Sequence, residues 1–128
     1  MVIGRPNPGK PDVMHISRKC VNTGSIQHEM LHGLGLAHEQ IRPDRDQFIK
    51  INWRNIERSK FKNYRKVGTN FSRWEYRDLD TPYDMLSVMH YSSYYHRRTP
   101  FSGPTITLRK NGVDTRKPTL TQHKDAVF

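Results

Sequence analysis

A histidine-rich stretch near the start of the chain, HEMLHGLGLAHE over residues 28–39, holds side chains that can bind a metal ion. His28 and His32 are four residues apart, so on an α-helix they lie about 40° apart around the axis and share one face. Two imidazoles in that arrangement can bind one cation, and zinc prefers such ligands in a tetrahedron. A third ligand must come from beyond the helix, where Gly35 predicts a turn and His38 follows three residues later. The spacing therefore predicts one zinc ion bound by His28, His32 and His38.

Glu29 follows His28 directly and can act on the water that occupies the fourth position of a catalytic zinc. Zinc lowers the pKa of such a water from about 15.7 to about 7. Glu29 is not needed as a ligand, so its carboxylate can take the water's proton as a general base and later pass it to a leaving amine. The arrangement predicts peptide hydrolysis without a covalent intermediate.

A polar helix face with three solvated histidines is the simpler interpretation of the same residues. A bare H-E-x-x-H pattern also occurs on ordinary amphipathic helices, so by itself it does not decide between the two. The extended pattern H-E-x-x-H-x-x-G-x-x-H requires a glycine and a third histidine at set positions, and this favours the metal site. The apolar residues of the stretch also leave the histidine face clear: Ile26, Met30, Leu31 and Leu34.

An α-helix over about residues 22–34 must position the first two histidines. Asn22 or Thr23 can cap its start, and apolar residues recur at helical spacing along it. Gly35 is suited to the left-handed conformation that commonly ends a helix. The remaining expected elements are short: a loop and then a strand at 13–16, an extended stretch at 48–51, a short helix capped by Asn52, an irregular segment at 67–87, a turn at 87–91, a strand at 104–108, a turn at Asn111-Gly112, and a last helix capped by Thr121.

The extended motif is the metzincin signature, and the chain resembles the astacin family of zinc metallopeptidases within that clan. Glu39 follows the third histidine, and the sequence SVMHY at residues 87–91 is similar to the astacin Met-turn. The flanking sequences HEQIRPDRDQFIKINWRNI and PTIT are also similar to astacins. The resemblance implies an α+β, metzincin-like catalytic domain. We expect a single domain over 1–128 with the active-site helix at about 22–34, an incomplete upper β-sheet, and an irregular C-terminal subdomain from about residue 39.

The resemblance also implies roles for residues outside the histidine motif. Met89 is expected beneath the zinc as a hydrophobic floor. Tyr91 is expected to be a fifth zinc ligand at rest and to hydrogen-bond the oxyanion during turnover. Glu39 pairs with the mature N-terminal amine in the family, and Cys20 resembles a cysteine that bonds an upstream partner. The implied activity is that of a secreted zinc endopeptidase with one zinc per chain and a peptide or protein substrate.

Astacin catalytic domains are longer at the N-terminus than this chain. Most of the upper β-sheet would precede Met1, and the strand that pairs with substrate would fall near residues 1–5. We therefore expect a partial domain in which Glu39 lacks its usual partner, and an unpaired buried charge is costly. The start, MVIGRPNPGK, has no apolar h-region, so secretion rests on the resemblance alone. A non-catalytic zinc-stabilised binding domain, or an inactive fragment of such a peptidase, is the alternative.

The chain is strongly basic, with 22 Lys and Arg against 12 Asp and Glu among 128 residues. A charge of +10 suits acidic partners, and aromatics interleave its densest patch at residues 60–66 as in nucleic-acid binders. The basic residues are otherwise spread along the chain, so we expect a solvated basic surface and no nucleic-acid partner. No run of 18 apolar residues exists, so we expect no membrane span. Arg116 and Lys117 suggest a preference for an acidic residue after the scissile bond. Four other histidines fit no ligand spacing and are expected to be ordinary surface or core residues: His15, His90, His96 and His123.

Overall fold

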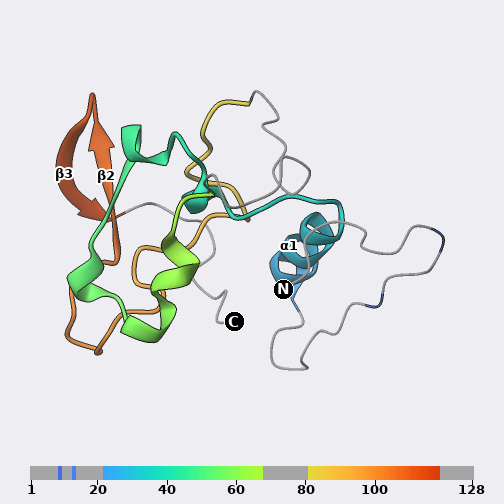
Figure 1. Ribbon diagram of the computed structural model, residues 1–128, viewed down its shortest axis with the longest axis horizontal. Helices are drawn as coiled ribbons and strands as arrows, with labels where there is room; N and C mark the ends of the chain where they lie inside the picture. Colours follow the sequence, from blue (N-terminus) through green and yellow to red (C-terminus); the bar gives the residue numbers. More distant parts are fainter. Residues whose placement is uncertain (1–8, 10–12, 14–21, 68–80, 119–128) are drawn as a thin grey trace.

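The computed structural model of the chain describes residues 9, 13, 22–67 and 81–118, with side chains up to residue 115. Helix α1 (Thr23–Gly33) lies on one side and a small sheet on the other, and the chain that leaves α1 runs between them (Figure 1). Helix and antiparallel sheet occur together, as expected for an α+β metzincin-like domain. The strand expected at 13–16, Cys20 and the helix from Thr121 lie outside the described residues, as do the side chains of Arg116 and Lys117. Within the described ranges, every helix is too short or too polar to cross a bilayer.

Both ends of α1 follow from local sequence. The Asn22 side chain accepts a hydrogen bond from the Ser25 amide at 2.9 Å, so Asn22 is the N-cap. At the other end, the Gly35 amide donates to the His32 carbonyl and the Leu36 amide donates to the Leu31 carbonyl, both at 2.9 Å. This pair of bonds is a Schellman motif, which requires a left-handed residue, and Gly35 has φ of 97°. The predicted helix and its glycine end are confirmed.

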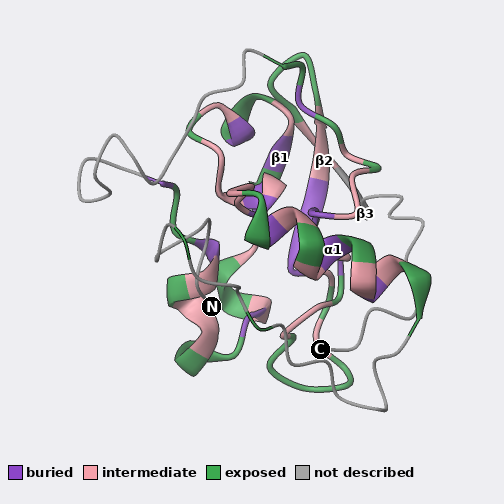
Figure 2. Cartoon of the chain, turned by 90° about the vertical axis from the view of Figure 1, so that its right-hand side faces the viewer, coloured by how far each residue is buried: buried purple, intermediate pink, exposed green. Residues whose placement is uncertain are grey.

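The apolar residues of α1 do not form its buried face. Met30 is 54% exposed and Leu34 is 75% exposed, whereas Ser25, His28 and His32 are buried. The helix therefore packs through the side that carries the histidines. Figure 2 shows this arrangement, with exposed residues along the outer part of α1 and buried residues on β1 and β2.

The sheet has three antiparallel strands in the order β1 (Ile49–Ile51), β2 (Ile106–Lys110) and β3 (Val113–Pro118). Asn111 and Gly112 have φ of 52° and 77°, the left-handed pair that a type I′ hairpin turn needs. The predicted extended stretch and the Asn-Gly turn are confirmed. The strand expected at 104–108 begins two residues later, and β3 was not expected, because VDTRKP has little apolar alternation.

The core lies between the sheet and the irregular segments around it. Its buried residues are Ile49, Ile51, Ile56, Tyr64, Tyr83 and Ile106. Short 3₁₀ turns bring the connecting chain over this core: η2 (Glu39–Ile41), η3 (Arg45–Gln47), η4 (Trp53–Asn55) and η5 (Arg58–Tyr64). The short helix expected after Asn52 is η4, although the Asn52 side chain donates to the Pro104 carbonyl instead of capping it.

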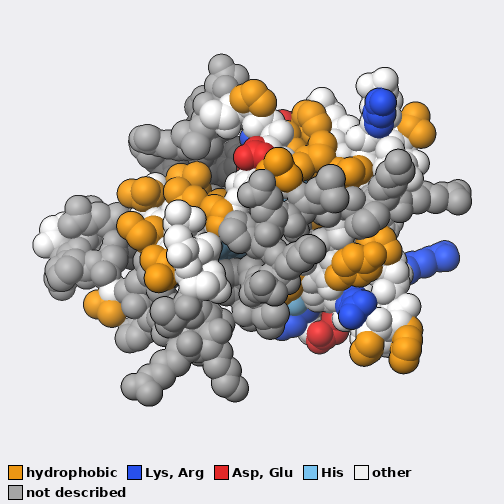
Figure 3. Space-filling model, turned by 180° about the vertical axis from the view of Figure 1, so that it is seen from behind, with side chains coloured by type: hydrophobic (Ala, Val, Ile, Leu, Met, Phe, Trp, Pro, Cys, Tyr) orange, Lys and Arg blue, Asp and Glu red, His pale blue; other side chains and the backbone are white. Residues whose placement is uncertain are grey.

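The aromatic residues of the basic patch face inward. Tyr64 is fully buried, and Phe61 lies against Trp53 with ring centroids 5.3 Å apart. Neither ring is arranged as an exposed stacking platform for bases. On the face seen in Figure 3, the described Lys and Arg side chains lie apart from one another. These observations favour a solvated basic surface.

Candidate metal centre

The three motif histidines converge on one point. The Nε2 atoms of His28 and His38 are 3.1 Å apart, and one ligand nitrogen from each of the three rings lies within 4.8 Å of the others. Tetrahedral zinc with nitrogen ligands at about 2.0–2.1 Å places those nitrogens about 3.3 Å apart. All three residues are buried, with exposed fractions of 5%, 2% and 8% in chain order. Among the described residues, this is the only group of three or more His, Cys, Asp or Glu side chains that could hold a metal ion.

Backbone carbonyls fix the orientation of two of the rings. The Nδ1 of His28 lies 2.8 Å from the Val88 carbonyl, and the Nδ1 of His32 lies 2.8 Å from the Leu36 carbonyl. A carbonyl only accepts hydrogen bonds, so each Nδ1 carries the proton and each Nε2 presents its lone pair. Such outer contacts hold metal-binding histidines in the correct tautomer. His28 is thereby joined to the 87–91 turn, and His32 to the chain just after α1.

The electrostatic environment favours the neutral form of the second and third histidines. Burial, together with the smaller effects of the neighbouring His32 and His28, lowers the pKa of His38 to about 3. Burial also lowers the pKa of His32. Zinc binds only the neutral imidazole. The buried His32 Nε2 has no hydrogen-bond partner among the described residues, and a cation at the centre of the three rings would satisfy it. The donor set and the unsatisfied nitrogen both fit zinc.

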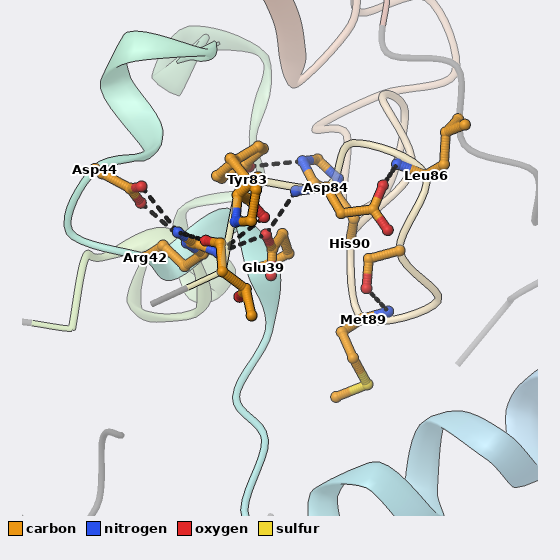
Figure 4. A network of polar contacts seen from close by, with 11 residues as sticks. Glu39, Arg42, Asp44, Tyr83, Asp84, Leu86, Met89 and His90 are labelled. Atoms are coloured by element: carbon orange, nitrogen blue, oxygen red, sulfur yellow. Dashed lines mark hydrogen bonds and ion pairs between the residues drawn. The ribbon is translucent and has the colours of Figure 1, made fainter. Parts of the chain in front are cut away.

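The 87–91 turn lies against the chain that leaves α1. The His90 amide donates to the Ser87 carbonyl at 2.9 Å and the Met89 amide to Ser87 Oγ at 3.1 Å. The Glu39 amide donates to the Met89 carbonyl at 3.0 Å, directly after the third histidine. Met89 is 2% exposed, and its side chain extends from the turn toward α1 (Figure 4).

Tyr91 lies beside the third histidine. Its ring centroid is 4.6 Å from that of His38, with an angle of 58° between the two planes. Burial raises the pKa of Tyr91, so its hydroxyl remains protonated at neutral pH. Of the site residues expected from the sequence, the structure thus groups three histidines and Tyr91, with Met89 on the adjoining turn and Glu29 half-buried on α1.

Comparison with known proteins agrees with this geometry. The model of the peptidase family described as "Astacin" matches residues 1–126. The chain belongs to the astacin family. Its relatives include high choriolytic enzyme 2 of Oryzias latipes, 41% identical over 73% of this chain and 34% of that protein. Zinc metalloproteinase dpy-31 of Brugia malayi is 39% identical over 90% of this chain and 18% of that protein.

The fold is also similar to that of a solved zinc-protease structure. High choriolytic enzyme 1, a hatching enzyme zinc-protease from Oryzias latipes, matches with a TM-score of 0.58 and 37% identity. The match covers 75% of this chain and 46% of that structure. This astacin chain therefore spans about a third of the choriolytic relative's sequence and less of the dpy-31 relative's.

Glu39 of this astacin has a charged partner, contrary to the expectation from sequence. Its Oε1 lies 3.1 Å from Arg42 Nη1 and accepts the Asp84 amide at 2.9 Å (Figure 4). Burial raises the pKa of Glu39, and the Asp84 amide and the Arg42 guanidinium both oppose that shift. The expectation of an uncompensated charge was wrong because η2 turns Arg42, three residues along the chain, back toward the carboxylate.

Two of the astacin's other histidines also have defined surroundings. His90 is buried, with Nδ1 2.7 Å from the Tyr91 carbonyl and Nε2 2.8 Å from the Tyr83 hydroxyl. His96 lies against Tyr95 with ring centroids 3.8 Å apart. Both are packed against neighbouring side chains and lie outside the group formed by His28, His32 and His38, whereas His15 and His123 lie outside the described residues.

Sequence reasoning missed the residues that hold the turn in place. Gln40, Tyr83 and His90 contact the turn or lie in it, and Arg42 pairs with Glu39 in the segment that faces it. Their hydropathy suggests surface positions, yet Gln40 is fully buried. Their places in the sequence could have identified them, because Gln40 and Arg42 closely follow the third histidine and His90 lies inside the turn.

Proposed function

We propose that residues 1–128 form a single, partial peptidase domain of a zinc-dependent endopeptidase that cleaves peptide or protein substrates. The convergence of three buried imidazole nitrogens on one point supports this proposal most directly. In this proposal, His28, His32 and His38 bind the zinc ion. Glu29, Met89 and Tyr91 surround it. Zinc, when bound, polarises a substrate carbonyl as a Lewis acid and lowers the pKa of a coordinated water toward about 7.

Glu29 is the proposed general base. It follows His28 on α1, so its side chain leaves the helix about 100° further around the axis. Its carboxylate is close enough to the metal-facing rings to raise the pKa of His32, against the larger opposing effect of burial. In the proposed reaction, Glu29 takes a proton from the attacking water and delivers it to the amine that leaves.

Tyr91 and Met89 complete the proposed site. Because burial raises the pKa of Tyr91, its hydroxyl can donate a hydrogen bond to the oxyanion that forms at the scissile carbonyl. At rest, the same hydroxyl is the proposed fifth ligand, since the ring already lies beside His38. Met89 is buried and is the proposed apolar floor of the site.

A matched pair of variants tests the assignment of Glu29. Glu29→Gln keeps the size of the side chain and removes its basicity, so we expect one zinc per chain and a fall in peptide cleavage of about 10²–10⁴-fold. Glu57→Gln makes the same change at an exposed position and should keep both zinc and activity. Zinc is measured by elemental analysis and cleavage on a peptide library. Full activity in zinc-loaded Glu29→Gln would refute the mechanism. A wild-type chain that binds zinc but cleaves nothing would instead favour a zinc-stabilised binding domain.

We also propose an extracellular location, as the resemblance to secreted peptidases implies. The test is expression of the full-length transcript in animal cells. The peptidase is expected in the culture medium, and complete retention inside the cells would contradict this location.

A further inference from the structure

The main chain of Tyr91 is held from both sides by buried polar side chains. Its amide donates to Gln40 Oε1 at 3.2 Å. Its carbonyl accepts from His90 Nδ1 at 2.7 Å. Gln40 is 0% exposed and His90 is 6% exposed, so water cannot easily replace either contact. Neither side chain has a role in the hydrolysis proposed above.

Gln40 is itself fixed in position. Arg45, which is 4% exposed, donates from Nη1 to the Gln40 carbonyl at 2.9 Å and also to the Tyr64 carbonyl. The Gln40 Nε2 has no partner among the described residues, so the part of the amide in use is its acceptor oxygen. Gln40 lies two residues after His38, and its hydrogen bond therefore ties Tyr91 to the segment that carries the third histidine.

His90 is anchored on its other side. Since the Tyr91 carbonyl can only accept, His90 Nδ1 carries the proton and Nε2 accepts from the Tyr83 hydroxyl at 2.8 Å. Tyr83 is stacked on Phe48, with ring centroids 4.8 Å apart and planes 10° from parallel. The imidazole thus joins the Tyr91 carbonyl to the core.

We propose that Gln40 and His90 are positioning residues that hold the Tyr91 ring against His38. The inference rests on the proposed function for what Tyr91 does in the reaction, whereas the placement of the ring rests on the contacts above. A merely structural role would lower the stability of the fold without moving this one ring.

The ring contact can be measured directly in the metal-free full-length chain by nuclear Overhauser effects between Tyr91 and His38. We expect clear effects in wild type, because the ring centroids are 4.6 Å apart. Gln40→Met fills the same space without an acceptor, and His90→Phe removes both ring nitrogens. Each should weaken the effects several-fold. Asn22→Ala, which removes the N-cap of α1, should lower stability and leave them unchanged.

Two further variants separate the contacts of His90. The short side-chain amide introduced by His90→Asn can replace Nδ1 and still reach the Tyr91 carbonyl, so this variant should keep most of the effects. The longer amide introduced by His90→Gln can replace Nε2 only, so that variant should lose them. This comparison decides the role of His90 even if His90→Phe does not fold. Equal loss in both variants would overturn that role, and unchanged effects in Gln40→Met would overturn the role of Gln40.

Kinetics gives a second readout in the zinc-loaded protein. Gln40→Met should lower kcat by about tenfold, which is about 1.4 kcal/mol, with KM and zinc content unchanged. A change in KM alone would contradict a positioning role. If wild type cleaves no peptide, the proposed function fails, but the ring contact still decides whether Gln40 and His90 hold Tyr91.

Discussion

Replacing Arg42 with methionine should destabilise the protein far more than removal of an ordinary surface charge. Arg42 Nη1 lies 3.1 Å from Glu39 Oε1, and Nη2 lies 2.9 Å from both Asp44 Oδ2 and the Thr81 carbonyl. The guanidinium also lies over the Tyr83 ring, 5.5 Å from its centroid. These contacts join the segment after the third histidine to the chain that leads into the 87–91 turn.

The size of the effect follows from burial. The Arg42 and Glu39 side chains are only 12% and 15% exposed, so Arg42→Met leaves a mostly buried carboxylate without its cation. Removing one partner of a buried pair costs about 3–5 kcal/mol, and the remaining contact with water favours the lower end, about 3 kcal/mol. Lys66 pairs with Asp46 at 2.8 Å, but these side chains are 43% and 48% exposed. Lys66→Met is therefore the matched control, with an expected cost of about 0–1 kcal/mol.

The assay is urea unfolding of the zinc-saturated protein, followed by circular dichroism at pH 7. With a slope of about 1–3 kcal/mol per molar urea, Arg42→Met should lower the midpoint by at least about 1 M. The double variant Glu39→Gln/Arg42→Met should recover part of the loss, because the unpaired charge is gone. Equal costs for Arg42→Met and Lys66→Met would refute the argument, since burial would then have no effect on the strength of the pair.

Three further predictions concern the metal and the helix end. Removal of zinc with a chelator should lower the free energy of unfolding, and added zinc should restore it, because the ligands are brought together only in the folded state; an unchanged urea midpoint would contradict this. Burial lowers the pKa values of His32, His38 and His90. In the metal-free protein, the stability that depends on these rings being neutral should therefore be complete above about pH 6.5. It should be lost as the pH falls toward about 3, which is the pKa of His38. Urea midpoints measured across that pH range test the direction of this dependence, and a midpoint that rises as the pH falls would contradict it. Gly35→Ala should lower the free energy of unfolding by about 1 kcal/mol, because Gly35 has φ of 97°. Gly33→Ala is the control: Gly33 lies inside α1, no atom lies within 4 Å of the added carbon, and the change should be neutral or stabilising. Urea unfolding compares the two variants.

Local spacing was enough to predict the helix and the convergence of the three histidines. The separation of His28 and His32 is fixed by helix geometry, and Asn22 and Gly35 act through neighbouring backbone groups, so all four can be recognised in a short window of sequence. The Asn111-Gly112 turn could be predicted for the same reason.

The contacts that hold the site together could not be predicted in that way. Gln40 and Tyr91 are 51 residues apart, and His28 and Val88 are 60 apart. Such pairs leave no periodic pattern in the sequence. The amphipathic spacing in α1 likewise identified an apolar face without showing that the helix packs through its histidines, because tertiary contacts decide which face is buried.

The hydrogen bond from His28 to the Val88 carbonyl has a consequence for the order of events during biosynthesis. Until the ribosome has added Val88, both histidines of α1 are present, but the carbonyl that fixes the first imidazole is not. A nascent chain at that stage has the motif without the outer contact that strengthens metal binding. The orientation of the first imidazole of α1 is therefore fixed only once the chain extends through Val88, 60 residues further along.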